Sequence, residues 1–426
     1  MKDGTVRIMK ALLNLTPRIA VGALLILMVW GCGSIPQLKE GSEGAYVRLP
    51  FVRVLIDNSS PEMTIEGGSS FTLECLKGDK CVVYHASRSV SFVQDDGMIR
   101  ILMAKRGIGD RFDEVIITPR GMKGLLNYRA NRYRGMMKVL PNGVNLELIN
   151  IVHMDDYLKG VVPPEIGFTG ESEFEAIKAQ AVAARTYSMS RLSQYSDEEF
   201  DMRSDVTDQV YSGVEAEKSL VSKAIDDTRG YVIKYDDKLI NAYYHSTCGG
   251  YTDDINEVWE KPAAPYLRAV KDSNYCNWSK YYNWTESYTA QQLKMRIEQY
   301  LSADRGREIK IGDILDIYVR TQTAGGRVAE LVVRTADGDF SFGKDRIRWV
   351  FKRSSNPELI LESARFRIET THDDSGKLMR ADFMGGGYGH GVGMCQCGAI
   401  GMSRDGKKFN DILATYYRNT ELSRLY

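Results

Sequence analysis

An isolated glutamate, Glu165, follows two prolines in the stretch VVPPEIGF. The prolines restrict the backbone before it and predict that it lies on a loop. Ile166 and Phe168 are apolar neighbours that can partly remove its carboxyl group from water. Such desolvation raises the pKa of a carboxyl group, which lets it donate a proton near neutral pH. The alternative is a surface glutamate on a turn, and the residues by themselves leave both interpretations open.

A histidine and two cysteines form a second group of reactive side chains. His245 and Cys248 are spaced H-x-x-C in YYHSTCGGYT, and Cys276 follows in SNYCNW. One imidazole and two thiolates are good zinc ligands, but a structural zinc site needs four, and Tyr281 is a poor fourth. We therefore favour the alternative, a Cys248–Cys276 disulfide with His245 free to act in a site.

The third group is the glycine-rich stretch GGGYGHGVGMCQCGAIGM at residues 385–402. It lacks the Lys-Ser/Thr pair and the strand–helix context of a nucleotide-binding loop. His390 is either a structural hydrogen-bonding residue or a site residue, and the surrounding glycines favour the site. A bridge between Cys395 and Cys397 would be strained, so a free thiol is expected there.

A helix is predicted to follow Glu165. Ser172 and Glu175 have the spacing of a capping box. A buried stripe with many alanines then recurs at helical spacing; its members are Phe174, Ile177, Ala181, Ala184 and Ser188. Lys178 and Arg185 occupy an adjacent stripe, which places both cations on one face.

The remaining pattern predicts an α+β fold that is rich in β-structure. Residues 46–150 read as short strands separated by Gly, Asp and Asn, whereas residues 151–426 mix helical and strand periods. Cys75 and Cys81 flank the turn-like LKGDK, which predicts a hairpin with a disulfide across it.

The N-terminus has the features of an export signal. Residues 1–31 combine a basic leader with an apolar run that is too short to favour a membrane span, and the run ends at Gly31-Cys32. This resembles a bacterial lipoprotein signal peptide, with lipid attached to Cys32 and a tether over residues 32–45. The alternative is an uncleaved anchor helix. Both place the body of the protein in the cell envelope, outside the cytoplasm, on the periplasmic or outer-membrane side.

The charge balance argues against nucleic-acid binding. The chain has 56 basic and 56 acidic side chains, and removal of the leader leaves a net charge of −3. No broad basic surface follows from such a balance.

Taken together, these segments resemble the stage II sporulation protein D family, which includes the amidase enhancers. The resemblance covers nearly the whole chain after the tether. The matching segments are INIVHMDDYLKGVVPPEI, EAIKAQAVAARTYSMSR, DVTDQVYSGV, NAYYHSTCGGYTDD, PYLRAV, GGGYGHGVGMCQCGAIGM and FNDILATYY.

The resemblance implies a cell-wall protein that acts on peptidoglycan glycan strands, with helices and strands around a substrate groove. Sporulation members are lytic transglycosylases that prefer strands stripped of stem peptides, and their catalytic glutamate falls on Glu165. The products would carry 1,6-anhydroMurNAc ends, and no cofactor would be required. The amidase-enhancer branch implies the alternative, a non-catalytic wall-binding protein that recruits or stimulates a cell-wall amidase.

The resemblance also implies further site residues. Lys178 or Arg185 would hold the lactyl carboxylate of MurNAc, although Arg185 could equally form a structural salt bridge. Some family members hold zinc through two histidines and two cysteines, which His245, Cys248 and Cys276 match, with Tyr281 where a second histidine is expected. The candidate contacts with the sugars are Tyr187, Asp208, Gln209, Tyr211 and His390.

Overall fold

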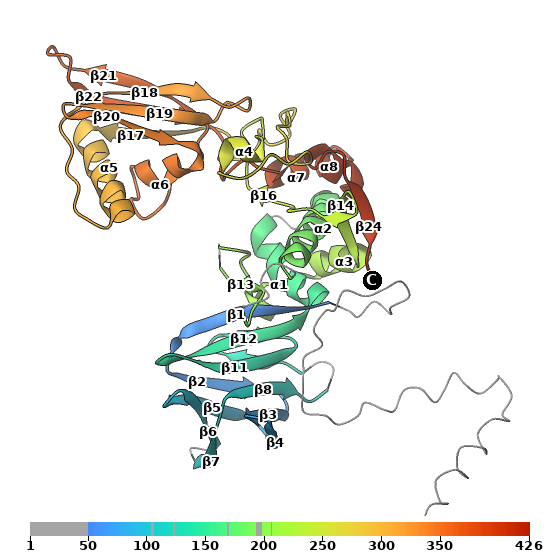
Figure 1. The fold of residues 1–426 in the computed structure, drawn as a ribbon. Coiled ribbons are helices and arrows are strands. Elements are labelled where there is room, and N and C mark those ends of the chain that lie inside the picture. Colours follow the sequence, from blue (N-terminus) through green and yellow to red (C-terminus); the bar gives the residue numbers. More distant parts are fainter. Residues whose placement is uncertain (1–49, 104–105, 122–123, 168–169, 193–197, 206) are drawn as a thin grey trace, which may run out of the picture. The chain divides into compact units, whose positions relative to one another are not determined.

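The computed structural model describes residues 50–103, 106–121, 124–167, 170–192, 198–205 and 207–426. The predicted signal peptide, the lipid-bearing Cys32 and the tether lie outside these residues. None of the helices in the described ranges combines the length and apolar character that crossing a bilayer requires. Helices and strands are mixed along the chain, which confirms the α+β prediction (Figure 1).

Two antiparallel-rich sheets form the N-terminal part. The first has the strand order β13-β1-β12-β11-β8-β3-β4, and the second the order β10-β9-β2-β5-β6-β7. Buried side chains of both sheets belong to one hydrophobic core, which continues into the helices that follow. The strands are β1 Phe51–Ser60, β2 Glu62–Gly67, β3 Phe71–Lys77, β4 Lys80–Ala86, β5 Ser89–Asp95, β6 Met98–Met103, β7 Arg106–Phe112, β8 Glu114–Pro119, β9 Leu126–Tyr128, β10 Asn131–Tyr133, β11 Met136–Asn142, β12 Asn145–His153 and β13 Met202–Arg203.

The predicted hairpin at LKGDK is present, but the disulfide proposed for it is not formed. Strands β3 and β4 pair so that Cys75 lies opposite Val82 and Cys81 lies opposite Leu76. Because successive side chains of a strand point to opposite faces, the two cysteines lie on opposite faces of the sheet. Cys75 is a buried free thiol.

The centre of the chain is helical. The helices are α1 Met154–Ile166, α2 Phe174–Arg191, α3 Ser219–Asp227, α4 Ile255–Val258, α7 Gln396–Arg404 and α8 Phe409–Tyr416. They are accompanied by β14 Tyr231–Tyr235, β15 Lys238–Leu239, β16 Tyr244–His245, β23 Met394–Cys395 and β24 Glu421–Arg424. Helix α2 contacts α1, α3, α7, α8 and β14. Its alanines let these neighbours approach closely, and Ala181 and Ala184 are fully buried.

The predicted capping box before α2 is wrong. Ser172 belongs to a 3₁₀ turn at Glu171–Glu173, and its hydroxyl donates to the Glu173 carboxylate at 2.7 Å. The Glu175 carboxylate instead accepts the backbone N–H of Phe409 at the start of α8, 3.0 Å away. The bond between Glu175 and α8 thus replaces the predicted local bond between Glu175 and the helix N-terminus.

The segment between the central helices and α7 forms two three-stranded sheets with their own core. The sheet orders are β17-β22-β21 and β18-β19-β20. Helices α5 and α6 contact these strands (Figure 1). The bounds are β17 Trp284–Thr289, α5 Ala290–Arg305, β18 Ile314–Gln322, β19 Val328–Thr335, β20 Gly338–Gly343, α6 Ile347–Phe351, β21 Phe366–His372 and β22 Leu378–Gly385. A buried ion pair, Arg327–Asp253 at 2.9 Å, joins this segment to the centre.

Candidate functional site

Glu165 lies in the last turn of α1, not on the loop that the two prolines predicted. Strand β12 leads directly into this helix, and His153 caps it by accepting the N–H of Asp155 at 3.2 Å. The helix ends at Gly167, whose φ of 71° suits glycine. The sheet therefore fixes where the helix begins, and the helix carries the glutamate.

Pro163 and Pro164 lack the N–H groups that would bond the carbonyls of Lys159 and Gly160 inside the helix. The Gly160 carbonyl accepts the N–H of Ser212 instead, at 3.3 Å. Gly160 also makes room for this segment, because a Cβ there would lie 2.6 Å from the ring of Tyr211.

The chain at 209–213 thus lies against the last turns of α1. It brings the backbone N–H of Val210 to within 3.2 Å of Glu165 Oε1. A proton on the carboxyl group then belongs on Oε2, the oxygen that this hydrogen bond leaves unused.

Burial raises the pKa of Glu165, and the hydrogen bond from Val210 partly offsets that rise. Among the described residues, no second carboxylate contributes to the shift. The cause is therefore desolvation, which favours the neutral acid over the carboxylate. The side chain is partly exposed, so the acid remains accessible.

Two glutamines hold the surroundings of Glu165. Gln396, the first residue of α7, donates from Nε2 to the Glu165 carbonyl at 3.0 Å. Gln209 accepts from Tyr157 and Ser188 through Oε1, at 3.0 Å and 2.7 Å. Its Nε2 donates to the hydroxyl of Tyr244 at 3.0 Å. Gln396 was not among the predicted site residues, although it lies inside the GHGVGMCQ segment.

Several predicted substrate contacts are buried and already paired. Arg185 is fully buried and bonds the Asp155 carboxylate at 3.0 Å and the carbonyls of Tyr231 and Ile225. This arrangement matches the structural alternative for Arg185 and leaves its guanidinium no open side. Gln209 is also buried, and the hydroxyl of buried Tyr211 donates to Asn150 at 2.8 Å.

Lys178 is paired with acidic side chains other than Glu165. Its Nζ lies 3.5 Å from Glu175 and 3.7 Å from Asp227. It also lies over the ring of Phe174, at 4.6 Å from the centroid. Lys178 and Arg185 do not share an acidic partner, because Lys178 pairs with Glu175 and Asp227 whereas Arg185 pairs with Asp155.

Arg191 links two other predicted residues. Its guanidinium donates to the hydroxyl of Tyr187 at 2.9 Å and to the Asp208 carboxylate at 2.7 Å. Tyr187 is buried, and the Asp208 side chain is only 7% exposed, with its second oxygen accepting the N–H of Arg203 at 2.9 Å. The ring of Tyr187 lies 5.8 Å from that of Tyr243.

His390 is held as a neutral ring. Its Nδ1 accepts the N–H of Val392, and its Nε2 faces the Tyr244 carbonyl, both at 3.0 Å. Burial lowers the pKa of His390 to about 3, with Arg348 and Arg327 adding to the effect. The ring lies 4.7 Å from that of Trp259.

Trp259 also lines a pocket of about 420 Å³ together with Lys344 and the exposed Trp349. A series of contacts leads from Glu165 toward Trp259: Gln209, next to Val210, donates to the Tyr244 hydroxyl, and the Tyr244 carbonyl faces His390, whose ring lies beside Trp259.

The zinc ligands that the sequence suggested are not assembled as a set. His245 is buried with Nδ1 3.3 Å from the Val392 carbonyl and lies outside the group of metal-ligating atoms that contains Cys248 and Cys276. Tyr281 packs its ring against Tyr388 at 4.3 Å. Cys248 and Cys276 are free thiols with their Sγ atoms 3.5 Å apart, so the alternative disulfide is not formed either.

The sequence is similar to two family models and to several known proteins. A family model described as stage II sporulation protein matches residues 142–235, which include Glu165 and the segment around Val210. A model described as a domain of unknown function matches residues 273–393.

Three curated relatives are similar over most of the chain. An uncharacterised protein of Brachyspira hyodysenteriae is 32% identical over 68% of this chain and 72% of its own length. Stage II sporulation protein D of Bacillus subtilis is 31% identical, over 64% of this chain and 75% of its own. The amidase enhancer of Bacillus subtilis is 29% identical over 62% of this chain, a match that spans 40% of that longer protein.

Proposed function

This chain belongs to the stage II sporulation protein D family, and we propose that it is a lytic transglycosylase of the bacterial cell wall. Its substrate would be the MurNAc–GlcNAc linkage of peptidoglycan strands stripped of stem peptides. We further propose that a lipid on Cys32 anchors it in the cell envelope, outside the cytoplasm.

The observation that supports this proposal is the setting of Glu165. It is a partly exposed carboxyl group whose pKa is raised by burial, and a backbone N–H fixes one of its oxygens. Glycosidases that use water or a covalent intermediate employ a pair of carboxylates. A single carboxyl group suffices when the sugar supplies its own nucleophile.

The proposed reaction balances around that one group. Glu165 Oε2 gives its proton to the glycosidic oxygen, and the bond between C1 of MurNAc and that oxygen breaks. The resulting carboxylate takes the proton of the C6 hydroxyl while O6 bonds to C1. Glu165 regains its proton, no water is consumed, and the products are a free GlcNAc end and a 1,6-anhydroMurNAc end.

The strand would pass over partly exposed aromatic rings. Tyr243, Trp259 and His390 form a connected series, with ring centroids 5.0 Å and 4.7 Å apart at Trp259. The exposed Lys261 lies over the rings of Tyr243 and Trp259. Flat rings beside a cation suit an anionic sugar strand better than the buried Arg185 does. Asp208 is poorly placed for such a contact, because its side chain is only 7% exposed and its two oxygens accept from Arg191 and from the backbone N–H of Arg203.

The test uses the full chain with peptide-free glycan strands and mass spectrometry of the products. We expect anhydro-ended fragments from the wild type and none from Glu165→Gln, since general acid catalysis contributes about 10²–10⁴-fold. The matched control is Glu175→Gln, because Glu175 is also a partly buried glutamate that accepts a backbone N–H. Equal cleavage by Glu165→Gln and wild type would refute the proposal.

The relative named amidase enhancer supports a second candidate, a wall-binding protein that stimulates an amidase. The same preparations separate the two. If wild type and Glu165→Gln both bind glycan, neither cuts it, and both accelerate a purified cell-wall amidase equally, the binding function holds and the enzymatic one fails.

A further inference from the structure

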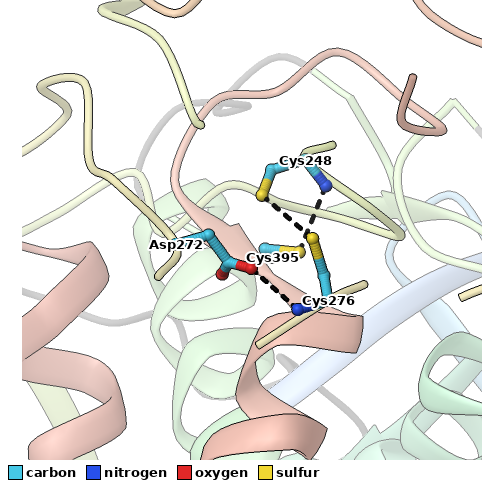
Figure 2. Close-up of side chains that lie close together, drawn as sticks. All are labelled: Cys248, Asp272, Cys276 and Cys395. Carbon is cyan, nitrogen blue, oxygen red and sulfur yellow. Dashed lines mark hydrogen bonds between the residues drawn. The ribbon is translucent and has the colours of Figure 1, made fainter. Parts of the chain in front are cut away.

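Four buried side chains with metal-binding atoms meet beside the proposed active site. They are Cys248, Asp272, Cys276 and Cys395, and their ligand atoms all lie within 4.8 Å of one another (Figure 2). Cys248 follows β16, Asp272 and Cys276 belong to one turn, and Cys395 precedes α7. Nothing in the proposed reaction uses them.

The donor set and its spacing suit one tetrahedral ion. The Sγ atoms of Cys248 and Cys276 are 3.5 Å apart. Two thiolates bound at about 2.3 Å to one tetrahedral zinc ion are about 3.8 Å apart, whereas disulfide sulfurs are about 2.05 Å apart. From this arrangement we propose that Cys248, Asp272, Cys276 and Cys395 bind a structural zinc ion.

Backbone N–H groups point at the sulfurs as they do around bound thiolates. Cys395 Sγ accepts from the N–H of Cys248 and of Gly398, both at 3.2 Å. Cys248 Sγ accepts from the N–H of Gly250 at 3.3 Å. The positive φ of Gly250, 107°, allows the turn that makes this contact. Such bonds stabilise negative charge on sulfur and fix the direction of each ligand.

The carboxylate is oriented in the same way. Asp272 Oδ2 accepts the N–H of Cys276 at 2.8 Å, and the hydroxyl of Tyr416 donates to Oδ1. Tyr416 lies in α8 and is almost fully buried. Asp272 is therefore a fixed ligand rather than a solvated surface group.

The chemistry of the donors selects the metal and its role. Three thiolates and one carboxylate are a soft, mainly sulfur set, which favours zinc over magnesium or calcium. Four protein ligands leave no position for water or substrate, so the site is structural. It lies next to the catalytic region, because Gln396 follows Cys395 and bonds the Glu165 carbonyl. The ion would hold α7, and with it Gln396, in place.

The test measures metal content in the full chain purified without chelators. We expect about one zinc per chain by mass spectrometry of the elements. Replacing the zinc with Co²⁺ should produce the thiolate-to-cobalt absorption and the intense visible bands of a tetrahedral sulfur site. Cys276→Ser and Cys395→Ser should lose the metal. The matched control is Cys397→Ser, because buried Cys397 lies outside the four-residue cluster.

Tyr416→Phe keeps all four ligands and tests the site without removing one. It should lower zinc affinity by about 10–100-fold, the usual effect of losing a hydrogen bond to a ligand. The proposal fails if the wild type carries no metal and its reduced form takes up neither Zn²⁺ nor Co²⁺. It also fails if peptide mapping of the alkylated native protein finds Cys248 and Cys276 joined as a disulfide. These readouts do not depend on glycan cleavage, so they stand apart from the test of Glu165.

Discussion

Gln396 donates a hydrogen bond to the backbone carbonyl of Glu165 at 3.0 Å, although 231 residues separate them in the sequence. The same Nε2 lies 3.4 Å from the side-chain oxygen of buried Gln180. Helix α7 is thus tied to the last turn of α1 and to α2. This hydrogen bond is made to the backbone of Glu165 and not to its carboxyl group.

Gln396→Ala should therefore act on the position of Glu165. We expect kcat for glycan cleavage to fall with little change in KM. The free energy of unfolding should fall by about 1–3 kcal/mol, because the buried side-chain oxygen of Gln180 and the Glu165 carbonyl both lose a partner. Steady-state kinetics and denaturant unfolding measure both. Gln322→Ala is the control for loss of a side-chain bond to a carbonyl, since Gln322 Nε2 also donates to a carbonyl, that of Phe366, from an exposed position at the end of β18. An unchanged kcat in Gln396→Ala would contradict a positioning role.

The raised pKa of Glu165 predicts a pH-dependent stability. The folded state binds this proton more tightly than the unfolded state. The carboxyl group therefore begins to cost stability as the pH rises above the ordinary glutamate pKa of the unfolded state, and the full cost is reached above its folded pKa. Glu165→Gln, which stays neutral, should unfold at a higher temperature than the wild type near neutral pH. The difference should vanish as the pH falls below the ordinary pKa of a glutamate.

The pH dependence of glycan cleavage should also report the protonation of Glu165. The acid step needs the protonated form, so cleavage should decline as the pH rises through the pKa of Glu165, which lies above that of an ordinary glutamate. A pH profile of kcat with its alkaline limb at the usual glutamate pKa would show that burial does not tune this residue.

Local patterns predicted the elements well where a single segment decides the outcome. The helical spacing of Ile177, Ala181 and Ala184 predicted the buried face of α2, and LKGDK predicted the β3–β4 hairpin. The mixed α+β class followed from the change of period after residue 150. In each case the hydrophobic pattern and the turn residues lie within the element itself.

Patterns were misleading where a distant partner decides the outcome. Two prolines usually end a helix, but the N–H of Ser212 satisfies the Gly160 carbonyl and the helix continues to Ile166. Arg185 and Lys178 were predicted to lie on one face of the helix. In the structure only Arg185 is fully buried, where it pairs with the buried Asp155. The cysteine cluster joins Asp272 and Cys395 from separate segments, and no spacing rule connects them.

The burial of Arg185 predicts a structural effect without a change in substrate binding. Arg185→Met should lower the free energy of unfolding by about 3–5 kcal/mol, because Asp155 keeps its buried place with fewer partners. Lys178→Met should cost about 1 kcal/mol or less, since its ion pairs are longer and nearer to solvent. Denaturant unfolding compares the two. If KM for glycan rose tenfold in Arg185→Met while stability held, Arg185 would be a substrate contact after all.

At Gly160, substitution by alanine should have two opposite effects on stability, one from helix propensity and one from packing. Alanine inside a helix is normally about 1 kcal/mol more favourable than glycine. At Gly160, however, the added Cβ would lie 2.6 Å from the Tyr211 ring and 2.9 Å from the Gly213 carbonyl oxygen. Gly160→Ala should therefore destabilise the protein and, by displacing the segment that carries Val210, reduce cleavage.

The control for Gly160→Ala is Gly109→Ala. Gly109 lies in β7, and a Cβ added there would meet no atom of the described residues within 4 Å. That variant should retain wild-type cleavage and nearly wild-type stability. Thermal unfolding and product analysis on the same two preparations decide the matter. If Gly160→Ala proved more stable than the wild type and equally active, the prediction would be wrong. The position of the Val210 N–H beside Glu165 would then not depend on the close packing of residues 209–213 against α1.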